Sequence, residues 1–83
     1  MIEDEVEGID NRVDLARFIQ RLKHDLEVNE DEWENPDLPR FLDALGGWIE
    51  SMPGYFKNRG EELPDEPDWK LVGIALLAAR SYE

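Results

Sequence analysis

The chain lacks cysteine, has one histidine, and contains no apolar run long enough to cross a bilayer. Without cysteine it can form neither disulfides nor thiolate metal sites, which agrees with a reducing compartment. A membrane-spanning helix needs roughly 20 consecutive apolar residues, and residues 1–10 have neither the basic nor the apolar region of a secretory signal. We therefore expect a cytoplasmic protein that does not bind membranes.

Basic residues are also scarce: nine stand against twenty-one acidic residues, which gives a formal net charge of −12. Seventeen of the acids lie in three tracts without Lys or Arg, residues 1–11, 24–39 and 60–69. Nucleic acids and anionic lipids are bound by clustered Lys and Arg, so direct binding to either is disfavoured. This charge would attract a basic protein surface, although acidic tracts also simply keep small proteins soluble.

Sequence motifs for catalysis and for metal binding are missing as well. His24 has no cysteine or second histidine at metal-ligand spacing. The acidic run NEDEWENPD (residues 29–37) places Trp33 where a calcium loop needs a ligand. Neither a glycine-rich phosphate loop nor a nucleophile elbow is present. We expect a protein that is not an enzyme and that has no cofactor and no metal.

What the chain does contain is helical periodicity. Its 83 residues, 41% of them hydrophobic, are enough for a single domain, residues 1–83, with one core. Asn11 is a good N-cap, and Asp14 is placed to return a hydrogen bond. An apolar stripe at helical spacing follows, made of Leu15, Phe18, Ile19, Leu22 and Leu26. This pattern predicts a first helix from about residue 11 to residues 28–30.

A second helix is predicted from Asp37, which can cap it, to Pro53-Gly54, which is expected to end it. Its apolar stripe is Leu38, Phe41, Leu42, Leu45, Trp48, Ile49 and Met52. Gly46 and Gly47 lie inside this helix and cost roughly 0.8–1 kcal/mol each relative to alanine. We therefore expect close approach of a neighbouring helix, or a local kink, at this pair.

A third helix is predicted from Asp68 to about Tyr82, and it should be buried on most sides because residues 71–79 have almost no polar face. The segment before it, GYFKNRGEELPDEP (residues 54–67), is rich in glycine, proline and acids and predicts a long connection. The expected fold is all-α: a small compact three-helix domain with a long loop between helices two and three. Residues 1–10 are expected to be flexible or to form a short extra helix.

Three tryptophans raise the question of what is core and what is contact surface. Trp48 and Trp69 lie on helical stripes and are expected in the core. Trp33 lies in an acidic run between helices one and two, where we predict that it closes the core. The alternative is a partly exposed anchor for a partner.

The candidate partner-binding residues combine this tryptophan with its acidic neighbours and with the one locally basic segment, PGYFKNRG. They are Trp33, Tyr55, Arg59, Glu30, Asp31, Glu32 and Glu34. Tryptophan, tyrosine and arginine are the residue types enriched at interface hot spots. The alternative for Arg59 is an exposed ion pair that contributes about 0–1 kcal/mol and fixes the long connection.

Three further segments carry a resemblance: WENPDLPRFLDAL, GYFKNRG and LLAARSYE. Through them the chain resembles a family of short bacterial domains of unknown function, encoded as stand-alone acidic proteins. The resemblance runs from about Val13 to Glu83 and rests on aromatic and helix-capping residues. It implies a shared fold, and it supplies no substrate, cofactor or site residue.

Three functions fit these observations. The first is a non-catalytic interaction module that docks on a basic partner, as an immunity protein, an inhibitor, a nucleic-acid mimic or a regulatory subunit does. The second is a small-ligand binder or enzyme that uses carboxylates with Tyr55 and Arg59 in a concave pocket. The third is a purely structural homo-oligomer, assembled through the apolar third helix.

Overall fold

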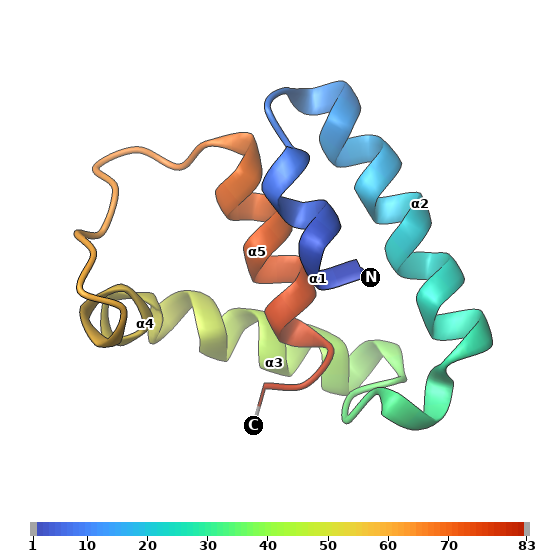
Figure 1. Cartoon of the computed structure of the whole chain (residues 1–83). Coiled ribbons are helices and arrows are strands. Elements are labelled where there is room, and N and C mark those ends of the chain that lie inside the picture. The colour runs from blue at the N-terminus through green and yellow to red at the C-terminus, as the bar shows by residue number, and fades with distance from the viewer. Residues whose placement is uncertain (1, 83) are drawn as a thin grey trace.

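The structure is a computed structural model that describes residues 2–82, and within that range every regular element is a helix (Figure 1). Met1 and Glu83, the ends of the predicted domain, lie outside the described residues. The elements are α1 (Ile2–Glu5), the 3-10 helix η1 (Val6–Gly8), α2 (Arg12–Val28), the 3-10 helix η2 (Glu30–Glu32), α3 (Leu38–Glu50), α4 (Met52–Asn58) and α5 (Trp69–Ala79). The all-α prediction is confirmed, and the prediction of three helices is wrong.

The main correction concerns the predicted long loop between helices two and three. Helix α3 ends at Glu50, and the next residues form α4 with Pro53 in its first turn, where a missing N–H costs little. Phe56 is buried and Tyr55 is half-buried on this short helix. Packing of these two aromatic rings therefore outweighs the Pro-Gly signal, and the irregular connection is reduced to residues 59–68.

The predicted starts of the three longer helices are confirmed. The side chains of Asn11, Asp37 and Asp68 each accept a hydrogen bond from the backbone N–H three residues later, at 2.9, 3.0 and 2.7 Å. Each cap satisfies one N–H group that the first turn of a helix leaves without a partner. The ends were less accurate, because α5 stops at Ala79 and does not continue to Tyr82.

Two buried clusters of apolar side chains meet at α5. The first lies between α5 and the N-terminal half of the chain and consists of Ile2, Val6, Ile9, Leu15, Phe18, Leu22 and Trp33. The second lies between α5, α3 and α4 and consists of Trp48, Phe56, Leu71 and Ala75. Ile74 packs against both clusters. Figure 1 shows α5 between α2 and α3, with α1 beside it.

At two positions, a glycine allows a neighbouring side chain to pack directly against the backbone of a helix. An added Cβ on Gly73 of α5 would lie 2.5 Å from Cδ1 of Ile9 and 3.2 Å from a methyl of Val6. In α3, an added Cβ on Gly47 would lie 3.2 Å from the ring of Tyr82. The expected neighbour of the glycine pair was another helix, whereas the close neighbour at Gly47 is the side chain of Tyr82, beyond the end of α5, and an added Cβ on Gly46 would meet nothing within 4 Å.

The tryptophans separate into two buried rings and one exposed ring. Trp33 and Trp48 are 8% and 5% exposed, which confirms both as core residues. Trp69 is 48% exposed, so its placement in the core is wrong. It is the first residue of α5 and directly follows the irregular connection.

Gly73→Ala is expected to destabilise the protein by about 1–3 kcal/mol, because Ile9 and Val6 are buried and cannot move away freely. Gly46→Ala is the matched control, since an added Cβ there meets nothing within 4 Å. The control should stabilise the protein by up to about 1 kcal/mol through helix propensity. Urea unfolding measures both changes, and equal effects would contradict the close packing at α5.

Trp33→Ala should lower the free energy of unfolding by about 3–5 kcal/mol, as the truncation of buried aromatic rings does. Trp69→Ala removes the same side chain from a half-exposed position and should cost less than about 1 kcal/mol. Guanidinium unfolding of the two variants side by side tests the assignment. Similar midpoints for the two would show that Trp33 does not close the core.

Candidate interaction surface

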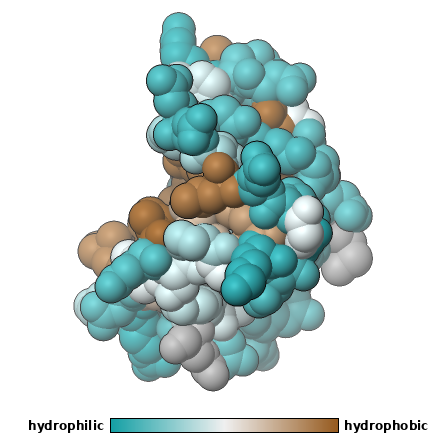
Figure 2. Space-filling model, turned by 90° about the vertical axis from the view of Figure 1, so that its left-hand side faces the viewer, coloured by the Kyte–Doolittle hydropathy of each residue, from teal (hydrophilic) through white to brown (hydrophobic). Residues whose placement is uncertain are grey.

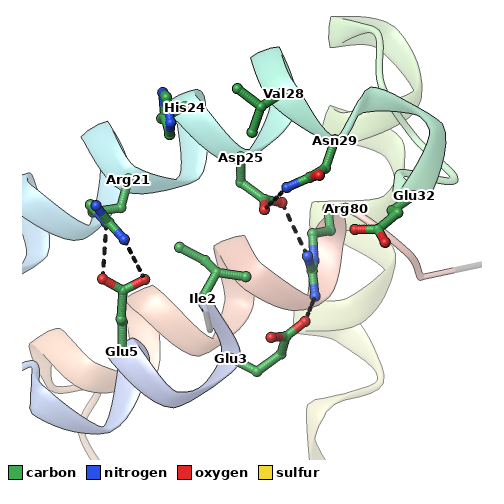
Figure 3. Close-up of a pocket in the computed structure, with 10 residues that line it drawn as sticks. All are labelled: Ile2, Glu3, Glu5, Arg21, His24, Asp25, Val28, Asn29, Glu32 and Arg80. Atoms are coloured by element: carbon green, nitrogen blue, oxygen red, sulfur yellow. Dashed lines mark hydrogen bonds and ion pairs between the residues drawn. The ribbon is translucent and has the colours of Figure 1, made fainter.

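A polar cluster centred on Arg80 joins the two ends of the chain (Figure 3). Its guanidinium pairs with Glu3 of α1 and, at 3.2 Å, with Asp25 of α2, and 13% of the Arg80 side chain is exposed. Asp25 also accepts hydrogen bonds from Trp33 at 2.8 Å and from Asn29 at 3.0 Å. The residues of this cluster therefore fix α1, α2 and the end of α5 to one another.

These contacts lower the pKa values of two carboxyl groups, those of Glu3 and Asp25. The hydrogen bond from Arg80 lowers the pKa of Glu3 below its ordinary value. For Asp25, burial raises the pKa, but the hydrogen bonds from Trp33 and Asn29 and the charge of Arg80 outweigh it, so the pKa is lowered. Both carboxylates are consequently ionised and occupied by internal partners at neutral pH.

The remaining ion pairs of the N-terminal acidic tract have the same role. Glu5 pairs with Arg21 of α2 at 2.9 Å, and Glu7 pairs with Lys70 of α5. The first of the three acidic tracts is thus largely engaged within the fold. Its charges hold α1 and η1 in place, and they contribute less to an exposed acidic face than their number suggests.

The acidic turn that contains Trp33 has a different environment. Glu30, Asp31, Glu32 and Glu34 are exposed, and none of them makes an ion pair with a residue between 2 and 82. The indole of Trp33 turns inward, and its ring stacks on Phe41 with centroids 6.0 Å apart. Only the acids of the predicted set therefore remain free for a partner at this turn.

Tyr55 and Arg59 lie elsewhere. Tyr55 packs edge-on against Trp48, with the ring centroids 5.1 Å apart, as part of the second cluster. Arg59 covers the ring of Tyr55 and pairs with Glu61 at 2.9 Å. The structure therefore does not bring them together with Trp33, and neither residue lines the cavities described next.

Two apolar grooves lie on either side of Leu76 of α5. The first, of about 330 Å³, is lined by Ile19, Leu22, Lys23, Leu26, Trp33, Asn35, Pro36, Asp37, Leu38, Phe41 and Leu76. The second, of about 220 Å³, is lined by Leu45, Ile49, Met52, Pro67, Leu71, Val72, Ala75 and Leu76. Both grooves are lined by Leu76, so they adjoin each other on α5, the first towards α2 and the start of α3 and the second towards the end of α3.

Large apolar side chains that line or adjoin these grooves are exposed. On α3, Leu38 of the first groove and Ile49 of the second are 68% and 49% exposed, and Leu42, which lines neither groove but lies on the same face of the helix, is 54% exposed. Ile19 of α2 and Val72 of α5 are also exposed. On the face seen in Figure 2, hydrophobic side chains gather around a hollow with hydrophilic side chains above and below. We call the grooves and these exposed residues the apolar surface.

This surface was not predicted from the sequence, where the apolar residues of α3 form a single stripe that is not divided into a buried and an exposed side. The buried side of α3 is carried by Ala44 and Trp48. Leu38, Leu42 and Ile49 recur at i, i+4 and i+11, which places them together on a neighbouring face. The signal in the sequence that could have revealed the surface is the width of the apolar stripe of α3, which is too wide to be covered by one neighbouring helix.

Each groove has a lining residue that belongs to an acidic segment of the sequence or directly follows one. The first groove reaches Asn35, Pro36 and Asp37, which follow the acidic turn, and the second reaches Pro67, within the acidic tract at 60–69. Of the acids between residues 61 and 68, only Glu61 makes an ion pair with a described residue. Two of the three acidic tracts therefore leave most of their charge unpaired, close in the sequence to residues that line the grooves.

Between residues 2 and 82 the chain has no helix long and apolar enough to cross a membrane. That part of the chain also has no group of three or more His, Asp and Glu side chains placed to hold a metal ion.

Comparison with known proteins identifies the family. Residues 11–83 match the family described as "Family of unknown function (DUF7660)", and because the match covers most of the chain, the protein belongs to this family. The expected membership in a family of unknown function is thereby confirmed. No curated protein and no solved structure matched the chain.

Arg80→Met should lower the free energy of unfolding at neutral pH by about 2–3 kcal/mol, less than for a fully buried pair because Glu3 is half exposed. Arg40→Met is the control, since its pair with Asp37 is exposed on both sides and contributes at most about 1 kcal/mol.

The same variant tests the pH dependence. Because the folded-state pKa values of Glu3 and Asp25 are lowered, their contribution is present at neutral pH and is lost as the pH falls below about 5. The stability difference between the wild type and Arg80→Met should therefore shrink on acidification. Denaturant unfolding at several pH values measures it, and a difference that stays constant would show that Arg80 acts through packing alone.

Proposed function

We propose that this protein is a non-catalytic interaction module that docks on a basic partner protein through the apolar surface. One observation supports the proposal above all: exposed apolar side chains from three helices line or adjoin two neighbouring grooves, and acids without ion pairs are close in the sequence to residues of both grooves. Interfaces combine an apolar centre with a polar rim in this way. An inhibitor or a regulatory subunit would use such a surface equally well.

The contiguity of the apolar side chains matters more than their number. Single exposed leucines are common on soluble proteins and need no explanation. Here, however, Ile19, Leu38, Ile49 and Val72 surround two grooves that meet at Leu76. Contiguous apolar patches rimmed by polar residues are typical of surfaces that bind other molecules.

Net charge selects the kind of partner. At −12, the chain attracts a positively charged protein and repels a second copy of itself. The acids at 30–34 are free to pair with such a partner, whereas those of the N-terminal tract are already used within the fold. The binding of a basic surface is accordingly favoured over self-association.

The alternative based on Tyr55 and Arg59 has less support. Their side chains interact with each other and with Trp48 and Glu61, and they line neither of the two apolar grooves. A small-ligand site or an active site would need a cavity into which these groups converge.

A double variant of the apolar surface tests the proposal. Leu42→Gln with Ile49→Gln removes two exposed apolar side chains and should leave the fold intact, because surface substitutions change stability by about 0.5 kcal/mol. The control, Val13→Gln with Val28→Gln, changes two equally exposed valines outside the apolar surface. Each protein is immobilised and exposed to lysate from the source cells at about 50 mM and about 500 mM salt.

We expect the wild type and the valine control to retain the same basic protein at low salt, and the Leu42/Ile49 variant to lose it. Quantitative mass spectrometry of the retained proteins provides the measurement. Retention of the same proteins by all three would place the contact elsewhere. A wild type that retains no protein beyond the bare support would overturn the proposal.

A further inference from the structure

We propose that the segment of the partner that occupies the apolar surface is a cationic amphipathic α-helix, which lies on α5 between α2 and α3. This inference rests on the function proposed above and goes further, because it specifies the secondary structure, the charge and the location of the bound segment. Three properties of the surface support it: the chemistry of its lining, the arrangement of its walls, and the charge of the segments next to its residues in the sequence.

The lining selects a helix over an extended peptide. The second groove is formed by apolar side chains and proline alone, and the first has polar side chains only at Lys23, Asn35 and Asp37. An extended segment buried there would leave its backbone N–H and C=O groups without partners, at a cost of several kcal/mol. Between residues 2 and 82 there is also no strand whose edge could pair with it. A helix satisfies its own backbone groups.

The walls have the arrangement of a helical bundle that lacks one member. Helices α2 and α3 both pack on α5 but have little contact with each other, and Figure 1 shows them diverging from the turn that connects them. Leu76 of α5 lines both grooves, the first together with Ile19 of α2 and the second together with Ile49 of α3. Packed helices present such apolar stripes to one another at interaxial distances of about 8–10 Å.

Acids close in the sequence to residues of the two grooves supply the charge complementarity. Glu34, which is exposed and makes no ion pair with the described chain, directly precedes Asn35 of the first groove, and Glu66 and Asp68 flank Pro67 of the second in the sequence. A helix with Lys or Arg along its outer face and at both termini would carry the charge opposite to that of these carboxylates. Lys23, the one basic residue of the lining, makes no ion pair with the described chain.

A designed peptide tests this directly. It has about 18 residues, enough to form a helix on binding, with leucine at i, i+3, i+4 and i+7 and lysine on the opposite face. Binding of a fluorescein-labelled copy is followed by anisotropy, and the helicity of an unlabelled copy by circular dichroism. We expect saturable binding accompanied by a gain in peptide helicity.

Three control peptides separate the contributions of stripe, charge and helix. One has the same composition in scrambled order, one carries glutamate in place of lysine, and one has two central prolines that prevent helix formation. Each should bind at least about tenfold more weakly than the parent peptide. Equal binding of the scrambled or the proline peptide would overturn the inference, because attraction between opposite charges alone would then explain the signal.

Protein variants locate the binding site. The double variant Leu42→Gln with Ile49→Gln should raise the Kd of the parent peptide by about tenfold or more. The control, Val13→Gln with Val28→Gln, should change this Kd by less than about twofold. Failure of the parent peptide to bind the wild type, or equal effects of the two double variants, would overturn the inference.

The two proposals can fail separately. A basic protein that is retained from lysate and lost with the Leu42/Ile49 variant, together with no binding of the helical peptide, would leave the interaction function standing and reject the helix. Sedimentation of the protein alone decides the remaining alternative. A dimer at micromolar concentration that is abolished by the Leu42/Ile49 variant would assign the apolar surface to a second copy of the chain and would overturn both proposals.

Discussion

Helix α5 has to serve two clusters of apolar side chains at once, and the rest of the structure depends on this constraint. It is an 11-residue helix with the first cluster on one side and the second on the other. Small residues make this possible. The absence of a side chain on Gly73 leaves room for Ile9, and the small side chains of Ala75 and Ala79 are buried. After α1, α2, α3 and α4 have taken their places, no element of the described chain remains to cover its third side.

The same constraint explains how the acidic residues are used. The first acidic tract forms ion pairs with three basic residues. Arg21 lies in α2, Lys70 lies in α5, and Arg80 directly follows α5. These pairs fix the short N-terminal helices against the central one, where their buried residues complete the first cluster. The two other tracts have no comparable supply of basic residues. Their charge therefore remains on the surface.

Local signals in the sequence were sufficient for the helix starts and the fold class. The caps at Asn11, Asp37 and Asp68 depend on residues within one turn, so they could be predicted without tertiary contacts. The extra helix α4 could not be predicted in this way, because Pro53-Gly54 indicates the end of a helix when its tertiary contacts are unknown. Tertiary burial of Phe56 reverses that local preference. Likewise, nothing near Trp69 in the sequence shows that about half of its side chain remains exposed.

The candidate site was predictable only in part, for a related reason. The acids at 30–34 were identified correctly as exposed residues, since charge predicts exposure directly. Trp33 could be placed in the core because one large ring can turn inward while its neighbours stay in water. The apolar surface was missed because a hydrophobic stripe does not reveal how many helices pack against it. The apolar residues of α3 extend over two adjoining faces, and only the structure shows that Trp48 is buried whereas Ile49 is exposed.

The exposed leucines of α3 therefore call for a physical explanation of their own. Elsewhere on this helix the solvent-facing positions hold Arg40, Asp43 and Glu50, as expected for an acidic protein with 36% charged residues. Leu42 and Ile49 are about as far from the core as these residues, so a polar side chain there would cost the folded chain little. Their apolar character contributes little to folding and exposes hydrophobic area to water. Removal of that area from water would require another molecule, which we propose to be positively charged because carboxylates without ion pairs are close in the sequence to residues of both grooves.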